Sequence, residues 1–340
     1  MSPPWYAPLL RCLSCGAAGL EVDPTQVRCP ACTATWPVVE GVPMLARSSP
    51  AAADRHAAIE AAVRAFYEKN PFPTYDEFDS VGSLLDKARR SVYAQLLDDQ
   101  VPPAARVLEV GCGTGQLAIF LSVAGRRCLG VDLCMASLRC GQQFRDRHGL
   151  QTVGFVQGNV FDLPVVEGAF DLVIAKGVLH HTPDAQRAFL EVARRVRPGG
   201  YLIVGLYNRY GRVPSWLRKQ LFRLVGREAL GGDYVMRHVL RSADKRRIWW
   251  EDQYNHPHET WHSVDEVLGW FRTAGLSYIS AYPPITLGRT PRDREDRPAL
   301  FAPSRPGHPI EHLLVQLSWM FTIGREGALF DLIARRPPES

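Results

Sequence analysis

The stretch that decides the fold runs from residue 107 to residue 115 and reads Val-Leu-Glu-Val-Gly-Cys-Gly-Thr-Gly. Apolar and β-branched residues lead directly into three glycines at alternate positions, Gly111, Gly113 and Gly115. This pattern predicts a buried strand that ends in a tight turn, where the backbone approaches a ligand closely. The spacing differs from the Gly-x-Gly-x-x-Gly of a pyrophosphate-binding turn. The acidic Glu109 would repel phosphate and favours a cationic ligand such as a sulfonium or an amine.

Four further segments follow this glycine turn in order. Residues 129–133 (Leu-Gly-Val-Asp-Leu) predict a second strand ending at Asp132, whose carboxylate suits two vicinal ribose hydroxyls. Residues 155–164 predict a third strand and the turn after it, and residues 170–174 predict a fourth strand. Residues 195–205 predict a helix end, a Gly-Gly turn and a fifth strand. One such motif is a weak signal, but the ordered set is a strong one.

The ordered set resembles the motifs of class I S-adenosylmethionine (SAM) methyltransferases over about residues 90–206. The resemblance implies an α/β fold with a doubly wound, seven-stranded, mostly parallel, Rossmann-like sheet. It also implies an enzyme that transfers a methyl group from SAM to an acceptor. A dehydrogenase is the alternative for a glycine-rich strand end, but it would need a helix N-terminus aimed at phosphates. The glycine spacing argues against it.

The resemblance also implies which residues bind SAM. They share positions at the strand ends and are Glu109, Gly111, Gly113, Gly115, Asp132, Leu133, Asn159, Val160 and Lys176. Glu109 is expected to help hold the ammonium side of the cofactor, and Asp132 its ribose. Asn159 and the backbone of Val160 are expected to face the adenine. The family more often has Asp at the Asn159 position, but the Asn carbonyl can still accept from the adenine amino group.

Candidates for the methyl acceptor site follow the fourth and fifth strands. His180 and His181 occupy a position where related small-molecule methyltransferases also carry a histidine pair. Either could be a general base near neutral pH, or could cap or pack. Tyr207 is the third catalytic candidate. The fourth-strand tip, residues 175–178 (Ala-Lys-Gly-Val), lacks the Asn/Asp-Pro-Pro-Tyr sequence of amino-methylating nucleic-acid enzymes.

We therefore expect a small molecule or metabolite as acceptor. RNA, chiefly tRNA, is the alternative within enzymes. A non-catalytic scaffold that binds SAM is the alternative outside them.

Four cysteines near the N-terminus form a Cys-x2-Cys-x13-Cys-x2-Cys pattern: Cys12, Cys15, Cys29 and Cys32. Two such pairs present four thiolates in tetrahedral geometry, which selects Zn²⁺. All four ligands come from the protein, so a structural site is expected. Residues 1–46 contain few large apolar side chains and could hardly fold without a metal.

Residues 36–45 (Trp-Pro-Val-Val-Glu-Gly-Val-Pro-Met-Leu) follow the fourth cysteine. This segment resembles the small zinc-ribbon proteins that activate tRNA and release-factor methyltransferases. The resemblance implies a ribbon fused to its own methyltransferase.

The expected domains are a zinc ribbon (1–46), a linker with a cofactor-covering helix (47–82), and the methyltransferase domain (83–340) with a lid insertion (206–262). The covering helix is expected over 55–69 and ends before Pro71. An aromatic stretch, residues 66–73, covers the end of this helix and the residues after it. In related methyltransferases a similar stretch closes over the cofactor.

Further elements are expected along the rest of the chain. They are a helix over 83–98, a helix over 263–275 opened by the capping box of Ser263 and Glu266, a sixth strand over 276–282, an apolar helix over 309–323 and a last, antiparallel strand over 329–335. The helix over 309–323 is too short to span a bilayer and contains polar residues, so packing against the core or lid is expected.

The segment His258-Glu-Thr-Trp-His262 matches the His-Glu-x-x-His pattern of zinc proteases. That site needs both histidines on one face of a helix. Pro257 and the capping box at Ser263 exclude such a helix, so a lid contact is expected instead.

The chain has 340 residues, 46% hydrophobic and 22% charged, with a net charge of +5. No apolar run approaches the ~20 residues that span a bilayer, and the N-terminus lacks signal-peptide features, so a cytoplasmic protein is expected. Residues 205–247 hold eleven Lys or Arg and three acids. This basic segment is either a solvated helix face or a docking surface for an anionic acceptor or nucleic acid.

Overall fold

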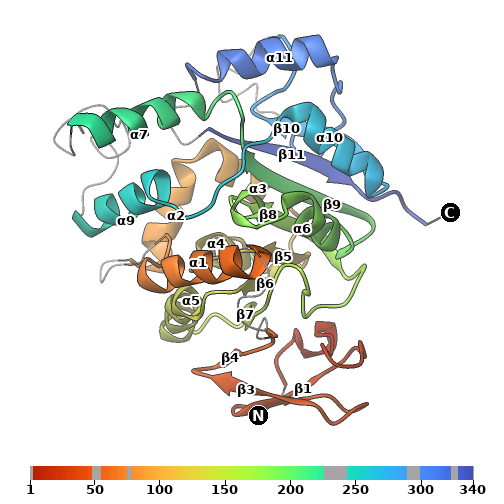
Figure 1. The fold of residues 1–340 in the computed structure, drawn as a ribbon. Coiled ribbons are helices and arrows are strands. Elements are labelled where there is room, and N and C mark those ends of the chain that lie inside the picture. Colours follow the sequence, from red (N-terminus) through yellow and green to blue (C-terminus); the bar gives the residue numbers. More distant parts are fainter. Residues whose placement is uncertain are drawn as a thin grey trace.

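The computed structural model describes residues 3–47, 55–73, 75, 79–225, 243–288, 299–322 and 328–339. In these parts of the chain, a seven-stranded sheet forms the centre of the molecule, and a four-stranded sheet lies at the end that carries the N-terminus (Figure 1). The expected α/β fold is confirmed. None of the helices in these parts has the length and apolar character that crossing a bilayer requires.

The large sheet has the strand order β10-β11-β9-β8-β5-β6-β7. Its strands are β5 (Arg106–Val110), β6 (Arg127–Asp132), β7 (Val153–Gln157), β8 (Phe170–Lys176), β9 (Val196–Tyr207), β10 (Ser277–Tyr282) and β11 (Leu329–Arg335). The chain adds β6 and β7 on one side of β5 and β8 and β9 on the other, so it is doubly wound about β5. Strand β11 runs opposite to the other six strands, as expected for the last strand.

Helices cover both faces of this sheet (Figure 1). They are α1 (Arg55–Lys69), α2 (Val81–Arg89), α3 (Val92–Gln100), α4 (Gln116–Val123), α5 (Met135–Arg147), α6 (Ala185–Ala193), α7 (Val213–Val225), α9 (Ala243–Tyr254), α10 (Val264–Thr273) and α11 (Pro309–Ser318). A 3₁₀ turn, η2 (Leu179–His181), follows β8.

The central strands are mostly apolar because both of their faces are buried. In β5, Val107 belongs to one buried cluster, whereas Leu108 and Val110 belong to the other. In β8, Leu172 and Val173 divide between the same two clusters. This alternation places one hydrophobic layer on each side of the sheet.

The glycine turn after β5 has left-handed backbone conformation at all three glycines. Their φ angles are 68° at Gly111, 54° at Gly113 and 73° at Gly115. A Cβ at Gly111 would come within 2.3 Å of Val178, and one at Gly115 within 2.3 Å of the Phe155 ring. The turn therefore requires glycine both for its conformation and for its close packing.

The N-terminal sheet, β1 (Glu21–Val22), β2 (Gln26–Arg28), β3 (Thr35–Val39) and β4 (Val42–Pro43), packs against the edge strand β7. Met44 pairs in parallel with Gln157, and the N–H of Leu45 donates to the Gln157 carbonyl at 3.0 Å. The Tyr6 ring fills the space above Gly154, where a Cβ would come within 2.3 Å of it. The ribbon thus shares a core with the large sheet.

Several expected elements are confirmed. The covering helix is α1, the helix with the Ser263 and Glu266 capping box is α10, and the sixth and last strands are β10 and β11. Two helices, α7 and α9, occupy the described part of the expected lid, and residues 226–242 lie outside the described residues.

Three expected boundaries are wrong. The single helix over 83–98 is two helices, because Ser91 accepts from the N–H of Ala94 and starts α3 as a new helix. The Gly-Gly turn lies inside β9, at an irregularity in its pairing with β8. The apolar helix over 309–323 ends at Ser318.

We predict that Gly115→Ala destabilises the fold by about 3 kcal/mol. A left-handed conformation costs an L-residue about 1–2 kcal/mol, and overpacking against the buried Phe155 adds about 1–3 kcal/mol. Gly149→Ala is the matched control, because φ is 64° there and nothing lies within 4 Å of the added Cβ. Urea unfolding should show a loss in the control of only about 1 kcal/mol. Equal losses in the two variants would contradict the packing role of Gly115.

Candidate functional site

A cavity of about 520 Å³ lies at the carboxyl ends of β5, β6 and β8. The sheet changes its winding direction between β5 and β8, and open α/β sheets bind ligands at this position. The volume is in the range of small-ligand sites. Side chains of α1 and α9 complete the wall. The cavity is therefore covered by two helices, here called the cap helix (α1) and the lid helix (α9).

The glycine turn forms the floor at one end of the cavity. Gly111 and Gly113 both line it. The chain after the cap helix lies directly on this turn, because a Cβ at Gly113 would come within 2.3 Å of the Phe72 carbonyl oxygen. The Thr114 hydroxyl also donates to the Pro73 carbonyl at 2.5 Å. These contacts place the aromatic stretch over the glycine turn, where it was predicted to cover the cofactor.

Two buried carboxyl groups, Glu109 and Asp132, face this end of the cavity. Glu109 accepts from the N–H of Ala118 at 2.9 Å, and burial, reinforced by the Asp132 charge, raises its pKa to about 8. Asp132 accepts from the N–H groups of Gly113 and Cys134, each at 2.8 Å, and burial raises its pKa as well. Two carboxyl groups that are buried from solvent and close together favour a cationic ligand.

The turn after β7 forms the neighbouring wall. Asn159, Val160 and Phe161 line the cavity there, and Leu133 joins them from the end of β6. The Asn159 carbonyl accepts from the N–H of Phe161 at 2.9 Å, and its amide donates to Glu60 of the cap helix at 3.0 Å. This network fixes the orientation of the Asn159 side chain.

The cap helix is held by polar contacts at its C-terminal end as well. The Glu68 carboxylate accepts from the N–H of Met135 at 3.0 Å and from that of Ala136 at 3.2 Å. These are free N–H groups of the first turn of α5, where a negative charge is favourable. No residue of α1 is fully buried.

Lys176, at the end of β8, also lines the cavity. Its ammonium forms an ion pair with the buried carboxylate of Asp331 and lies 4.1 Å from the ring centroid of Tyr93. The charge of Asp331 therefore neutralises that of Lys176 at this wall.

Two of the expected site residues lie outside the cavity wall. Gly115 packs on Phe155 and begins α4, so it shapes the turn from behind. The ring of His180 is fully buried and stacks on the Tyr207 ring at a centroid distance of 3.9 Å. Neither ring nitrogen of His180 has a hydrogen-bond partner among the described residues. His180 supports Tyr207 from the side away from the cavity.

His181 and Tyr207 do line the cavity, at the end away from Glu109. His181 shares a hydrogen bond between its Nδ1 and the carbonyl of His258 at 3.0 Å. Burial lowers the pKa of His181 to about 3, so its ring is neutral at physiological pH. Burial raises the pKa of Tyr207, which keeps the phenol protonated. A neutral His181 with so low a pKa is a poor general base.

Three polar residues of the cavity wall form a hydrogen-bond network that the sequence analysis did not predict: Tyr67, Asp252 and Gln253. The Tyr67 hydroxyl donates to Asp252 at 2.9 Å and thereby joins the cap helix to the lid helix. The Gln253 amide donates to Asp252 at 3.0 Å and to the Tyr207 hydroxyl at 3.1 Å. Burial raises the pKa of Asp252. Tyr67 lies within the aromatic stretch noted in the sequence, but nothing in the sequence pairs it with Asp252.

A buried arginine braces this end of the cavity from outside. Arg212 donates to the Gln253 side chain at 2.6 Å and to Glu259 at 2.7 Å. Its guanidinium also lies 4.1 Å from the Tyr207 ring centroid. Gln253 and Tyr207 are therefore held in place by one cation.

The His-Glu-x-x-His segment is not helical, as the sequence predicts. Nε2 of His258 is 3.1 Å from the Thr182 carbonyl, and Nδ1 of His262 is 2.8 Å from Glu266. The two histidines serve separate contacts, so a protease metal site is excluded here.

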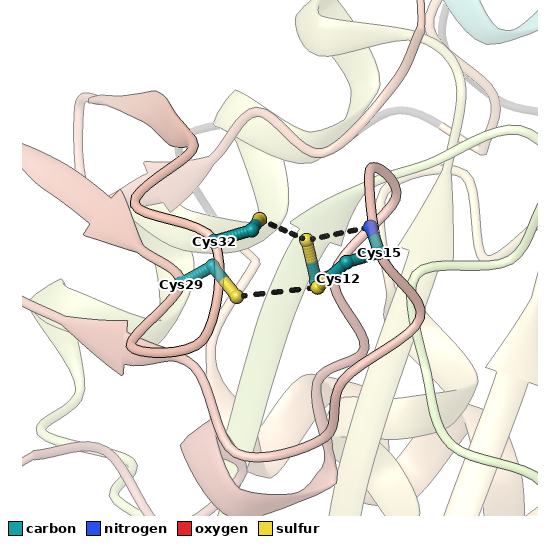
Figure 2. Close-up of side chains that lie close together, drawn as sticks. All are labelled: Cys12, Cys15, Cys29 and Cys32. Atoms are coloured by element: carbon teal, nitrogen blue, oxygen red, sulfur yellow. Dashed lines mark hydrogen bonds between the residues drawn. The ribbon is translucent and has the colours of Figure 1, made fainter.

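The four N-terminal cysteines point toward one another from two loops (Figure 2). The Sγ atoms of Cys12 and Cys32 are 3.5 Å apart, and those of Cys15 and Cys29 are 3.7 Å apart. A tetrahedron with bonds of about 2.3 Å from sulfur to zinc has edges of about 3.8 Å. The cluster thus has the dimensions of a four-thiolate metal site. In the described residues it is also the only group of this kind.

Part of the basic segment contacts the region around the cap. Lys245 lies 3.5 Å from the carboxylate of Asp79, and Arg247 donates to the Asn70 side chain at 2.9 Å. Arg227, Arg237 and Arg241 lie outside the described residues.

Comparison with known proteins identifies the central part of the chain. Residues 108–204 match a family model described as "Methyltransferase domain". The chain is 26% identical to an uncharacterized protein, syc1184_c, of Synechococcus sp., over 58% of this chain and 52% of that protein. It is 33% identical to the uncharacterized methyltransferase YcgJ of Bacillus subtilis, over 30% and 41%. It is 28% identical to ubiquinone biosynthesis O-methyltransferase of Escherichia coli, over 53% and 68%.

The chain spans about half the length of the first two of these relatives. Residues 108–204 are thus similar to the methyltransferase-domain family, and they lie in a doubly wound α/β sheet beside an N-terminal ribbon that carries four clustered cysteines.

Proposed function

We propose that this chain transfers the methyl group of SAM to a small-molecule acceptor held between the cap helix and the lid helix. The observation that carries the proposal is the cavity itself. It extends from the glycine turn, which lies within the residues that match the methyltransferase-domain model, to the side chains of Tyr67, Tyr207 and Asp252 under the two helices. A covered cavity of about 520 Å³ suits a small acceptor.

The residues present at the glycine turn fit SAM. Gly111 and Gly113 line the cavity, and Glu109 and Asp132 supply two carboxyl groups for a cation there. Each Asp132 oxygen accepts one backbone N–H and keeps a lone pair for a ribose hydroxyl. Leu133, Asn159 and Val160 would face the adenine side, and Lys176, held by Asp331, would complete the cofactor site. When bound, SAM supplies a methyl group activated by its sulfonium.

The chain's own residues then position the acceptor and take its proton. Asp252 is the proposed proton acceptor, because its raised pKa brings a buried carboxylate closer to neutral pH. Tyr67 and Gln253 each donate to Asp252 and orient it. His181 and Tyr207 contact the acceptor as neutral groups, and His180 acts through Tyr207.

The N-terminal ribbon is proposed to hold one structural Zn²⁺ on Cys12, Cys15, Cys29 and Cys32. Four thiolates leave no open coordination position, so the ion would stabilise the ribbon without a part in catalysis. On this basis the ribbon is residues 1–46, the linker and cap are 47–82, and the methyltransferase domain is 83–340 with its lid at 206–262. A four-thiolate site also favours a reducing compartment such as the cytoplasm.

Asp132→Ala should weaken the binding of SAM and of S-adenosylhomocysteine by about 1–3 kcal/mol, because ribose hydroxyls lose their partner. Isothermal titration calorimetry measures both affinities. Asp86→Ala, an exposed acid on α2, is the control and should bind both ligands as the wild type does. Unchanged affinity in Asp132→Ala would refute the proposed ribose position.

Methyl-labelled SAM, offered with a small-molecule extract or with total tRNA, tests the acceptor class. Label should enter the small-molecule fraction, and Asp252→Asn should lower its rate by at least about a hundredfold, the usual share of a general base. Burial raises the Asp252 pKa above its ordinary 3.8, so the wild-type rate should rise with pH as this carboxyl ionises. The variant should lack this acidic limb. Label found only in RNA would overturn the proposal in favour of an RNA methyltransferase, and no transfer to either pool would favour a scaffold.

Elemental analysis should find one zinc ion per chain, and both Cys12→Ser and Cys29→Ser should lose it. Because Tyr6 and Leu45 of the ribbon cover β7, the metal-free variants should also unfold at lower temperature. Cys140→Ser, a thiol on α5 outside the cluster, is the control and should keep the metal. Zinc retained by both ribbon variants would rule out this site.

A further inference from the structure

The exposed apolar side chains of this protein concentrate on two helices. Among the described residues, nine of the twelve exposed large apolar side chains lie on α7, on α11 or in the turn after α11. They are Trp216, Leu217, Leu221 and Leu224 on α7, and Ile310, Leu313, Leu314, Leu317 and Phe321 on or after α11. Both helices lie at the end of the molecule opposite the N-terminal strands (Figure 1).

On α11, the apolar stripe faces away from the protein. Ile310, Leu313, Leu314 and Leu317 have the i, i+3, i+4, i+7 spacing of one helix face, and they are 66%, 41%, 50% and 40% exposed. The inner face carries the polar His312 and buries it to 2%. The expected packing of this helix against the core is confirmed for its inner face, where Val315 and the following Trp319 join the main buried cluster. An amphipathic helix with its apolar face outward requires something to cover that face.

On α7, the exposed apolar side chains also share a face. At 3.6 residues per turn, Trp216, Leu217, Leu221 and Leu224 fall within an arc of about 140°. Phe222 points the other way and packs against the lid-helix rings of Trp250 and Tyr254, at centroid distances of 5.2 and 5.3 Å. The outer face of α7 is thus apolar, while its inner face rests on the lid helix.

The charged side chains of α7 all have one sign. Helix α7 carries Arg218, Lys219 and Arg223 and no Asp or Glu. The single acid of α11, Glu311, is paired with Arg305 at 2.6 Å. Helices with Leu, Trp or Phe on one face and Lys or Arg beside it bind the interface of anionic bilayers.

We propose that the outer faces of α7 and α11 dock this protein on the surface of an anionic lipid bilayer. The bilayer is favoured over a protein partner because α7 carries cations and no acid, because Arg305 neutralises the one acid of α11, and because the apolar residues include Trp216 and Phe321, aromatic side chains of the kind enriched at membrane interfaces. Neither helix crosses the bilayer. Since α7 packs on the lid helix, docking brings the covered end of the cavity next to the lipid headgroups.

Sedimentation with lipid vesicles tests the docking, and it needs no methyl transfer, so its outcome is separate from that of the proposed function. The wild type should bind vesicles of phosphatidylcholine and phosphatidylglycerol, and added salt should weaken the binding. Leu313→Ser with Leu317→Ser, and Leu221→Ser with Leu224→Ser, should each reduce it by at least about tenfold. Arg218→Gln with Arg223→Gln should abolish the preference over pure phosphatidylcholine vesicles.

Val92→Ser with Val123→Ser is the matched control, because these exposed valines lie on α3 and α4. This variant should bind vesicles as the wild type does, and circular dichroism checks that every variant folds. Absence of binding to anionic vesicles, or equal loss in the control, would overturn the proposal. So would dimers in sedimentation velocity that the α7 or α11 variants dissociate, since the surface would then join two copies of the chain.

Discussion

Everything at the cavity depends on the absence of side chains at the glycine turn. A Cβ at Gly111 would collide with Val178 after β8, one at Gly113 with the carbonyl of Phe72, and one at Gly115 with the Phe155 ring of β7. Three different segments thus meet at one turn, each in contact with a different glycine. Asp132 adds a fourth, because it accepts the N–H of Gly113 and ties the end of β6 to the same point. The turn both exposes backbone to a ligand and fixes the segments that surround it.

Much of the fold can be predicted from the sequence because its signals are local. Strands β5, β6, β7 and β8 are short apolar runs ended by glycine or acid, and the covering helix and the α10 capping box have clear boundaries. The break between α2 and α3 was not predicted, because Ser91 lies in the middle of a helical pattern and starts a new helix through a single hydrogen bond. That choice depends on what the two helices pack against.

The acceptor end of the cavity could not be predicted in the same way. Tyr67 and Asp252 meet although 185 positions separate them, and only the packing of the cap and lid helices brings them together. His180 and His181 are neighbours in the sequence, yet the 3₁₀ turn η2 sends one ring into the cavity wall and the other behind Tyr207. The contact between the ribbon and the large sheet could not be predicted either. Its cysteine pattern predicts a separate unit, but its Tyr6 completes the core above β7.

The cap helix has a property that bears on turnover. Helix α1 buries no residue fully, and polar contacts such as those of Glu60, Tyr67 and Glu68 help to hold it over the cavity. Water can replace such contacts at little cost, whereas separating the strands would expose two apolar layers. Lifting α1 therefore costs less free energy than separating the strands of the sheet. Exchange of spent cofactor can proceed through this opening while the sheet stays intact, and amide protons of α1 should exchange with solvent well before those of β5 and β8.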